Sequence, residues 1–256
     1  MSPWEALAVL GAGVGAGMIN AVVGSGTLIT FPTLLALGVP PVTANVSNNI
    51  GLVAGGVTAT WGYRRELRGQ EHRLARLAPL SLVGAVIGAV LLLRLPPAAF
   101  EAIVPVLIGI SVVLVLVQPR LAAAVQHRRA VAGGAGDRIG APAAAGTLLA
   151  GVYGGYFGAA QGVLLMGILG AVLPEDLQVI NGIKNALALV VNFVAAVTFV
   201  VVRPSAVDWA IVGLVSAGSL LGGAFGARVG RALPPVVLRS VVAFVGVVAI
   251  VRLVAA

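Results

Sequence analysis

Residues 4–38 read WEALAVLGAGVGAGMINAVVGSGTLITFPTLLALG, a long apolar run whose clearest interruption is Gly24-Ser25-Gly26. A helix that spans the hydrocarbon core of a membrane needs about 20 mostly apolar residues. Residues 4–23 meet that requirement, whereas residues 27–38 would rise only about 18 Å as a helix. The glycines predict a break, and the segment that follows them is expected to be a broken or re-entrant half-helix.

The rest of the chain has the same character. Charged residues make up 9% of the sequence, against about 25% in a soluble domain, and the mean hydropathy is +1.08. No Asp, Glu, Lys or Arg occurs in residues 6–63, 139–174, 185–202 or 209–227. Most of the chain is therefore expected to face lipid or other membrane helices.

Ten apolar segments can be distinguished, and two of them, 27–38 and 162–172, are too short to span. The sequence predicts an all-α integral membrane protein with about eight full transmembrane helices and two short broken or re-entrant segments. The first run lacks the basic flank of a signal peptide, so it is expected to be a retained helix. The segments are 4–23, 27–38, 42–62, 77–94, 99–117, 143–160, 162–172, 177–201, 207–230 and 234–254.

One polar linker, residues 118–142, divides the chain into a first transmembrane repeat (1–117) and a second (143–256). Arginines gather in this linker, in the loop at 63–76 and in the turn near 228–239. Because positive residues favour the cytoplasmic side, these three regions are predicted to be cytoplasmic. The protein is then a multi-pass protein of the inner cell membrane, with both termini outside the cytoplasm.

The two halves resemble each other when the first is shifted by 136 residues. Chance similarity among glycine-rich helices is the alternative explanation. Each half has an odd number of crossings, so the halves would be inverted, as in many secondary transporters. The matched positions are Gly15 with Gly151, Gly26 with Gly162, Asn45 with Asn181, Asn49 with Asn185 and, with small slips, Gly84–Gly88 with Gly218–Gly222.

Polar residues beside the two breaks form the first candidate site. A helix that restarts after Gly26 would point its N–H groups and its positive end at the gap, which suits an anion. Tight packing of helices through small residues is the alternative. The candidate donors are Asn20, Ser25 and Thr27 at the first break, with Tyr156 and Gln161 at the second.

A second candidate site consists of amides within the following helices. Asn45 and Asn49 are four residues apart and share a helix face with Asn48 beside them. Their counterparts in the second half are Asn181, Lys184 and Asn185, and Lys184 is the only lysine. Polar groups within a membrane often line a pathway, and a lysine there would attract an anion. The alternatives are hydrogen bonds between helices, and for Lys184 snorkelling or pairing with Glu175 or Asp176.

Other chemistries lack the residues that they need. There is no cysteine, and His72 and His127 lie in basic loops, so no metal site is expected within the membrane. The sequence contains no P-loop and no catalytic constellation, which argues against an enzyme and against a cofactor. The net charge of +8 is explained by orientation signals, so no nucleic-acid partner is expected. Carboxylates are absent from the middle of the spans, where cation carriers commonly place them.

Together these motifs resemble the TauE/SafE family of membrane transporters, and the resemblance covers essentially the whole chain. The resemblance implies an inner-membrane permease for sulfur-containing anions such as sulfite or sulfonates, which acts as an exporter in several members. It assigns no individual residue. The motifs are Gly17-Met-Ile-Asn20-Ala-Val-Val-Gly24-Ser-Gly26-Thr27, Gly38-Val39-Pro40-Pro41-Val-Thr43-Ala-Asn45, Gly155-Tyr-Phe-Gly-Ala-Ala-Gln-Gly162 and Asn181-x-x-Lys184-Asn185.

The sequence therefore predicts a secondary transporter whose partners are a small anion and the lipid bilayer. A channel-like anion pore and a membrane scaffold or assembly factor remain as alternatives. Saturable flux with counterflow would separate a carrier from a pore, and a scaffold would need no polar cluster in its interior. The sequence leaves the substrate, the direction of transport and a homo-oligomer open.

Overall fold

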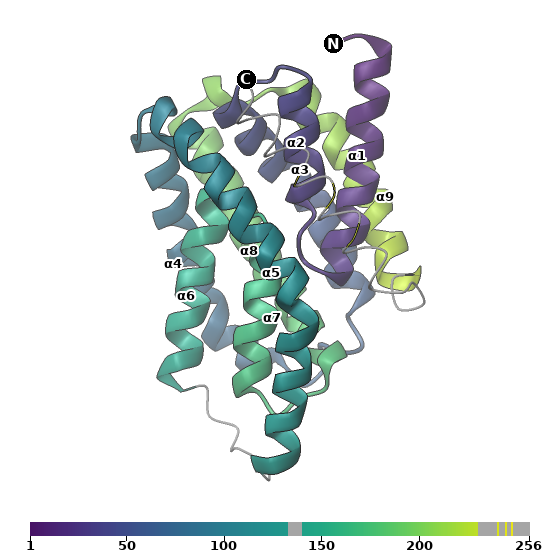
Figure 1. Cartoon of the computed structure of the whole chain (residues 1–256), viewed down its shortest axis with the longest axis vertical. Helices are drawn as coiled ribbons and strands as arrows, with labels where there is room; N and C mark the ends of the chain where they lie inside the picture. Colours follow the sequence, from purple (N-terminus) through teal and green to yellow (C-terminus); the bar gives the residue numbers. More distant parts are fainter. Residues whose placement is uncertain (133–139, 230–239, 241–243, 245–246, 248–256) are drawn as a thin grey trace.

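The computed structural model describes residues 1–132, 140–229, 240, 244 and 247. Within these residues the regular structure is helical and no strand occurs (Figure 1). In this described part of the chain, five helices are long and apolar enough to cross a membrane: α1 (Pro3–Val22), α4 (Glu71–Arg94), the part Pro97–Arg120 of α5, α8 (Leu177–Val202) and α9 (Trp209–Val229, counted to Arg228). The predicted all-α membrane fold is confirmed. The predicted segment 234–254 lies outside the described residues apart from three isolated positions.

The first half begins with a hairpin of two helices. Ser2 caps α1, since its hydroxyl accepts from the N–H of Glu5 and its own N–H donates to the Glu5 carboxylate. α1 ends at Val22, and after a short break α2 (Thr27–Ala36) returns toward the end of the molecule where the chain began (Figure 1). α3 (Pro41–Gly62), α4 and α5 (Pro97–Ala132) then run alternately down, up and down.

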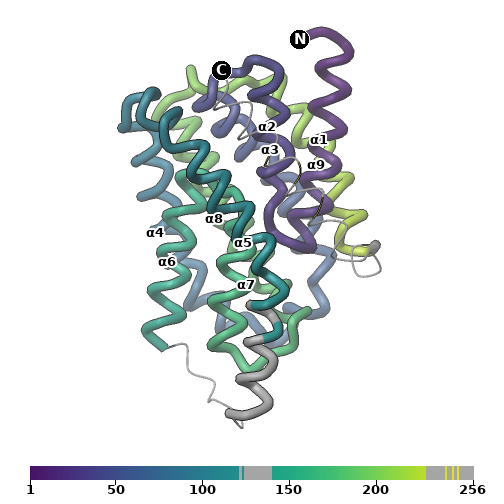
Figure 2. The backbone as a smooth tube through the Cα atoms, viewed as in Figure 1, coloured from purple at the N-terminus to yellow at the C-terminus, as the bar shows by residue number. Residues whose placement is uncertain are grey.

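The second half repeats this plan from the opposite end. α6 (Ala141–Tyr156) rises and α7 (Gln161–Val172) turns back, so this hairpin enters from the end that the first one does not use (Figure 2). α8 rises, a 3-10 turn (Pro204–Ala206) follows, and α9 descends. The short segments predicted at 27–38 and 162–172 are therefore the returning arms of two opposed hairpins.

Two boundaries differ from the sequence prediction. Residues 143–160 do not form one full span, because α6 has only 16 residues and ends at Tyr156. The chain leaves the helix there, and Gly158 adopts a φ of +80°, which glycine tolerates. The predicted linker also begins as helix, since α5 continues without interruption through Ala132, with Pro119 within it.

The first helix of each half packs against the fourth α-helix of the other half. α9 packs along α1, and α4 packs along α6, in both cases through glycines that bring the backbones together. A Cβ at Gly222 would lie 2.0 Å from the Val14 carbonyl oxygen, and a Cβ at Gly88 would lie 2.0 Å from the Val152 carbonyl oxygen. The predicted match of Gly84–Gly88 with Gly218–Gly222 thus corresponds to equivalent positions in the packing.

The packing also corrects one matched pair. Gly151 contacts Ser81 and Gly84 of α4, and the residue that contacts the equivalent part of α9 is Gly13, not Gly15. The nearest atoms to a Cβ on Gly15 instead belong to Ile29 of α2. The first helices of the halves are therefore related by a shift of 138 residues, whereas Asn45 and Asn181 keep the shift of 136. The two shifts differ by two residues, and the change occurs in the segment between the first helix and the asparagines, which includes the break.

The arginine-rich regions lie at one end of the molecule. The loop between α3 and α4, the far end of α5 and the start of α6 are all at the lower end in Figure 1, opposite the N-terminus. This agrees with the prediction that the 63–76 loop and the linker share one side. The C-terminus lies outside the described residues.

The two hairpins touch at their breaks, and this contact generates a prediction. A Cβ at Gly162 would lie 2.5 Å from the Gly24 Cα, so Gly162→Ala forces backbones apart. We expect this variant to lose about 1–3 kcal/mol of unfolding free energy, measured by thermal unfolding in detergent. Gly213→Ala is the control, because nothing lies within 4 Å of its added Cβ. Equal stability of the two variants would contradict the contact between the hairpins.

Candidate functional site

The breaks in the two hairpins meet inside the helix bundle. The N–H of Gly162 donates a hydrogen bond to the Gly24 carbonyl oxygen at 3.0 Å. Gly24 has a φ of +86°, and Ala160 has a φ of +59°, which is uncommon for a residue with a side chain. The backbone therefore turns sharply at both breaks, next to the contact. Helix ends, whose last backbone groups have no partner within their own helix, are brought into the interior at this point.

The end of α1 is surrounded by donors from α8. The Lys184 ammonium lies 3.2 Å from the Asn20 carbonyl oxygen and 3.5 Å from that of Ala21. The side-chain amides of Asn181 and Asn185 donate to the same Ala21 oxygen at 3.3 and 3.1 Å. These carbonyls belong to the last turn of α1, where no further helical N–H is available to them. Three α8 side chains thus cap a helix of the other half.

Lys184 is fully buried at this position, with 0% of its surface exposed. A buried ammonium needs compensation. The negative end of the α1 dipole supplies part of it. No carboxylate pairs with Lys184 in the part of the chain that the structure describes. Of the predicted alternatives, pairing with Glu175 is wrong, because Glu175 pairs with Arg73, and snorkelling is wrong, because the ammonium stays inside.

The first-half amides form an equivalent group at the end of α6. The Asn45 amide donates to the Tyr156 carbonyl oxygen at 3.0 Å, across the two halves. The Asn48 amide nitrogen lies 3.3 Å from the Thr27 hydroxyl, and its oxygen accepts from the Thr30 hydroxyl. Asn45 thus repeats the role of Asn181. Asn48 differs from its counterpart Lys184, since it binds α2 of its own half and carries no charge.

The candidate residues consequently lie in two groups, one on each break. Within the described residues, no hydrogen bond joins Asn45, Asn48 or Asn49 to Lys184 or its neighbours. The Asn49 amide instead reaches the Asn192 side-chain oxygen at 3.5 Å. That all six line one anion site stays a prediction. In this structure one group lies at the end of α1, and the other lies at the end of α6 and beside α2.

Several buried polar atoms near the breaks have no hydrogen-bond partner within the protein. Such atoms cost free energy unless water or a ligand satisfies them. They include one donor on Gln161 and the hydroxyl of Ser25, so the breaks retain donor capacity for a polar solute. The atoms are Ser25 Oγ, Asn45 Oδ1, Asn49 Oδ1, Gln161 Nε2 and Asn181 Oδ1.

Tyr156 takes part through its backbone, and its ring belongs to an aromatic cluster. The ring lies edge-on to Phe100 with centroids 5.7 Å apart, and Phe157 lies edge-on to Phe31 at 5.2 Å. Phe31, Phe100 and Phe157 are fully buried. Apolar rings therefore close the second break beside α5. The role of the Tyr156 hydroxyl as a donor to a substrate stays a prediction.

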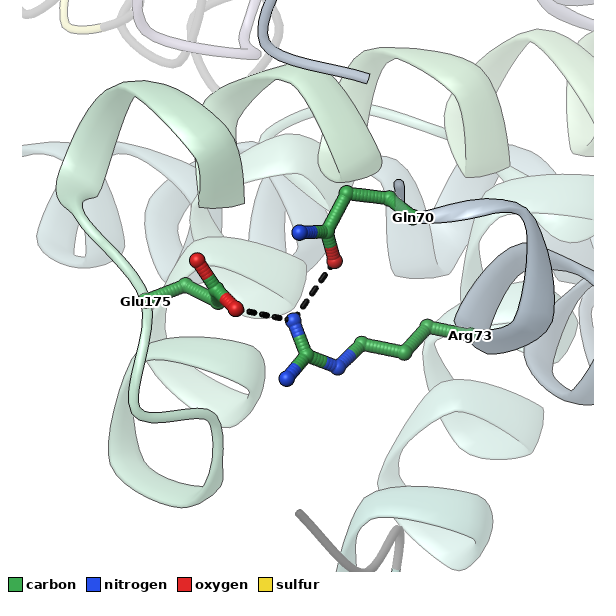
Figure 3. A network of polar contacts seen from close by, with 3 residues as sticks. All are labelled: Gln70, Arg73 and Glu175. Carbon is green, nitrogen blue, oxygen red and sulfur yellow. Dashed lines mark hydrogen bonds and ion pairs between the residues drawn. The ribbon is translucent and has the colours of Figure 1, made fainter. Parts of the chain in front are cut away.

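A further polar contact joins the halves at the arginine-rich end. Arg73, at the start of α4, donates to the Gln70 side-chain oxygen at 2.6 Å and pairs with Glu175 in the turn before α8 (Figure 3). The Arg73 side chain is 9% exposed and that of Glu175 is 26% exposed. The pair connects the hairpin of the second half to α4 of the first.

Sequence reasoning missed three partners of the candidate residues. The Tyr63 hydroxyl accepts from Asn181 at 2.7 Å, and Thr30 and Asn192 bind the asparagines of α3. Asn192 could have been found, because it is another amide within an apolar span. Tyr63 was not identifiable as a partner, since it lies at the far end of a different helix.

The arrangement offers hydrogen-bond donors and one ammonium group. Among the described residues, no cluster of three His, Asp or Glu side chains is placed to hold a metal ion. Amides, hydroxyls and an ammonium bind anions and polar solutes by hydrogen bonds.

The comparisons with known proteins agree with a transport role. The family model described as Sulfite exporter TauE/SafE matches residues 9–253. The chain is 27% identical over 242 residues to the probable membrane transporter protein ORF9 of Sinorhizobium sp, covering 94% of this chain and 88% of that protein. It is 27% identical over 223 residues to the probable membrane transporter protein YfcA of Escherichia coli strain K12, covering 83% and 76%.

None of the solved structures matches the chain significantly. The names of the family and its relatives indicate a membrane transporter rather than an enzyme. The family match covers nearly the whole chain, and with the apolar helices it establishes a multi-pass membrane protein. This chain belongs to the TauE/SafE family of membrane transporters.

Proposed function

We propose that this transporter moves a small, sulfur-containing anion, such as sulfite or a sulfonate, out of the cell, and that the anion binds at Lys184. Lys184 is buried with no carboxylate beside it in the described part of the chain, and this observation carries the proposal. An anion beside the ammonium would neutralise a charge whose polar contacts, among the described residues, are two carbonyl oxygens. The family description as a sulfite exporter supports the substrate class and direction.

The hydrogen-bonding capacity around Lys184 suits an oxyanion. An ammonium has three donors, and two carbonyls engage it here. Gly162 is close, since a Cβ there would lie 3.1 Å from the Lys184 side chain. The start of α7, with the positive end of its dipole, therefore adjoins the same region. A tetrahedral or pyramidal oxyanion could accept from the ammonium and lie against this helix end.

Access to this site requires a conformational change, because Lys184 is wholly enclosed. That requirement favours a carrier over the channel-like pore. The hairpins meet through backbones at a glycine contact, so movement of one half against the other would open the site to one side at a time. The inner cell membrane, with the arginine-rich end in the cytoplasm, is part of this proposal.

The first prediction concerns Lys184 itself. Lys184→Gln keeps a donor for the α1 carbonyls and removes the charge, so saturable binding of sulfite, thiosulfate, sulfate or small sulfonates to the purified protein should weaken roughly ten- to hundredfold, as expected for one charge-assisted hydrogen bond. Isothermal calorimetry measures this. Lys184→Arg should retain part of the affinity.

Arg203→Gln is the matched control, because it removes an exposed positive charge at the other end of α8. Binding that is equal in the Lys184→Gln and Arg203→Gln variants would leave Lys184 a helix cap and nothing more. If the unaltered protein binds none of these anions, the substrate class is wrong and the scaffold alternative gains support.

The second prediction concerns the pair Arg73–Glu175, which we propose keeps the site closed at the arginine-rich end. The chain contains no cysteine, so Ser25→Cys places a single thiol at a fully buried position. Labelling of this thiol by a membrane-impermeant maleimide should be slow. Adding Arg73→Gln should speed labelling from the arginine-rich side roughly five- to thirtyfold, the effect of losing 1–2 kcal/mol.

Arg76→Gln is the control, since Arg76 lies one turn further along α4 and is exposed. Charge exchange in Arg73→Glu/Glu175→Arg should restore slow labelling. A labelling rate that Arg73→Gln leaves unchanged would show that the pair does not restrain opening.

The third prediction concerns energy coupling. No carboxylate is paired with Lys184 in the described residues, so we propose that export needs no coupling proton. An inside-negative potential drives a monovalent anion outward by about 2.3 kcal/mol per 100 mV. In proteoliposomes, efflux should follow the imposed potential at constant pH on both sides. Strict dependence on a proton gradient at fixed potential would refute this coupling.

A further inference from the structure

A groove at the arginine-rich end lies between α3, the start of α4 and α8. It has a volume of about 530 Å³, within the range of about 300–1,000 Å³ that small-ligand pockets have. Its walls are mostly apolar, with Val57, Leu67, Leu74 and Leu189 among them, and Trp61, Arg64 and Arg68 stand at its rim. It is separate from the buried groups around Lys184.

The groove is open at the outer surface of the helix bundle. Trp61 is 69% exposed and Val57 is 52% exposed. Tryptophan is enriched where the hydrocarbon core meets the head groups, because its ring is apolar and its N–H is polar. Trp61 lies in the last turn of α3, one turn from the arginine-rich loop. The groove therefore extends from head-group level toward the hydrocarbon core.

Two guanidinium groups give the mouth of the groove a positive charge. The guanidinium carbon of Arg64 lies 5.2 Å from the centroid of the Trp61 ring, and one of its N–H groups donates to the Trp61 carbonyl oxygen. Four N–H donors of Arg64 remain. Arg68 is exposed, and no side-chain hydrogen bond or ion pair engages it in the described residues. Glu71 is the one carboxylate on the rim, and it accepts from the Gly69 N–H. The net charge there remains positive.

We propose that the groove binds an anionic phospholipid, with the phosphate between Arg64 and Arg68 and an acyl chain along the apolar wall. Guanidinium groups bind phosphate in a two-pronged geometry, and basic pockets between membrane helices suit anionic head groups. Thr60 also lines the groove. A free phosphate would leave the apolar wall uncovered.

Fluorescence quenching of Trp61 tests the proposal in the full-length chain. The protein has three tryptophans, so Trp4→Phe/Trp209→Phe leaves Trp61 as the only reporter. Phosphatidylglycerol with brominated acyl chains should quench Trp61 saturably in detergent micelles, relative to the unbrominated lipid. Brominated phosphatidylcholine should quench at least about tenfold more weakly, and glycerol 3-phosphate should not compete.

The arginine variants complete the test. Arg64→Gln/Arg68→Gln should weaken phosphatidylglycerol binding at least about tenfold, as the loss of a charge-assisted hydrogen bond implies. Arg65→Gln should not, because Arg65 is exposed in the same loop without lining the groove. Arg68→Gln alone is the fallback if the double variant lowers the thermal midpoint in plain detergent. Equal quenching by both lipids, or equal loss in Arg65→Gln, would overturn the proposal, and competition by glycerol 3-phosphate would assign the site to a soluble phosphate.

Discussion

The last turn of α1 ends inside the helix bundle, where its carbonyl oxygens cannot reach bulk water. A backbone group left unpaired in such surroundings costs several kcal/mol, so the fold must bring donors to it. Asn181, Lys184 and Asn185 do so from α8, and Asn45 does the same for the end of α6. Each broken helix is thereby capped by the third helix of the other half, α8 or α3, which couples the halves at the point where they would have to move.

Glycine makes this arrangement sterically feasible. Gly24 and Gly162 let the two breaks meet backbone to backbone, and Gly88 and Gly222 let the outer helices approach the hairpins closely. Van der Waals packing between small residues supplies much of the attraction between helices in lipid, where burial of apolar surface supplies little. The glycines that bring the helices together therefore also bring the two breaks, with the polar side chains beside them, into contact.

Much of the fold could be predicted because its signals are local. The run at 4–38 contains its own glycine break, and α1 and α2 begin and end within a few residues of the predicted positions. The end of α6 was placed four residues too late, because the turn involves Ala160 at a positive φ, a conformation that sequence rarely reveals. Of the candidate site, Asn45, Asn181 and Lys184 were recognised as buried polar groups within spans. Their partners were not, since a carbonyl oxygen of α1 or the hydroxyl of Tyr63 has no sequence signature as an acceptor.

The two halves repeat a geometry but not a charge. Asn48 and Lys184 occupy matched positions, yet only Lys184 is an ionisable group, and its ammonium contacts the end of the opposite hairpin. The similar geometry of the two halves accounts for donors at both breaks, but it does not account for the lysine, because a neutral amide is enough at the end of α6, as Asn45 shows. A buried positive charge is a costly way to cap two carbonyls when an amide serves at the equivalent position. The cost of this charge is the reason for proposing that Lys184 serves a negatively charged substrate and does more than hold the helices together.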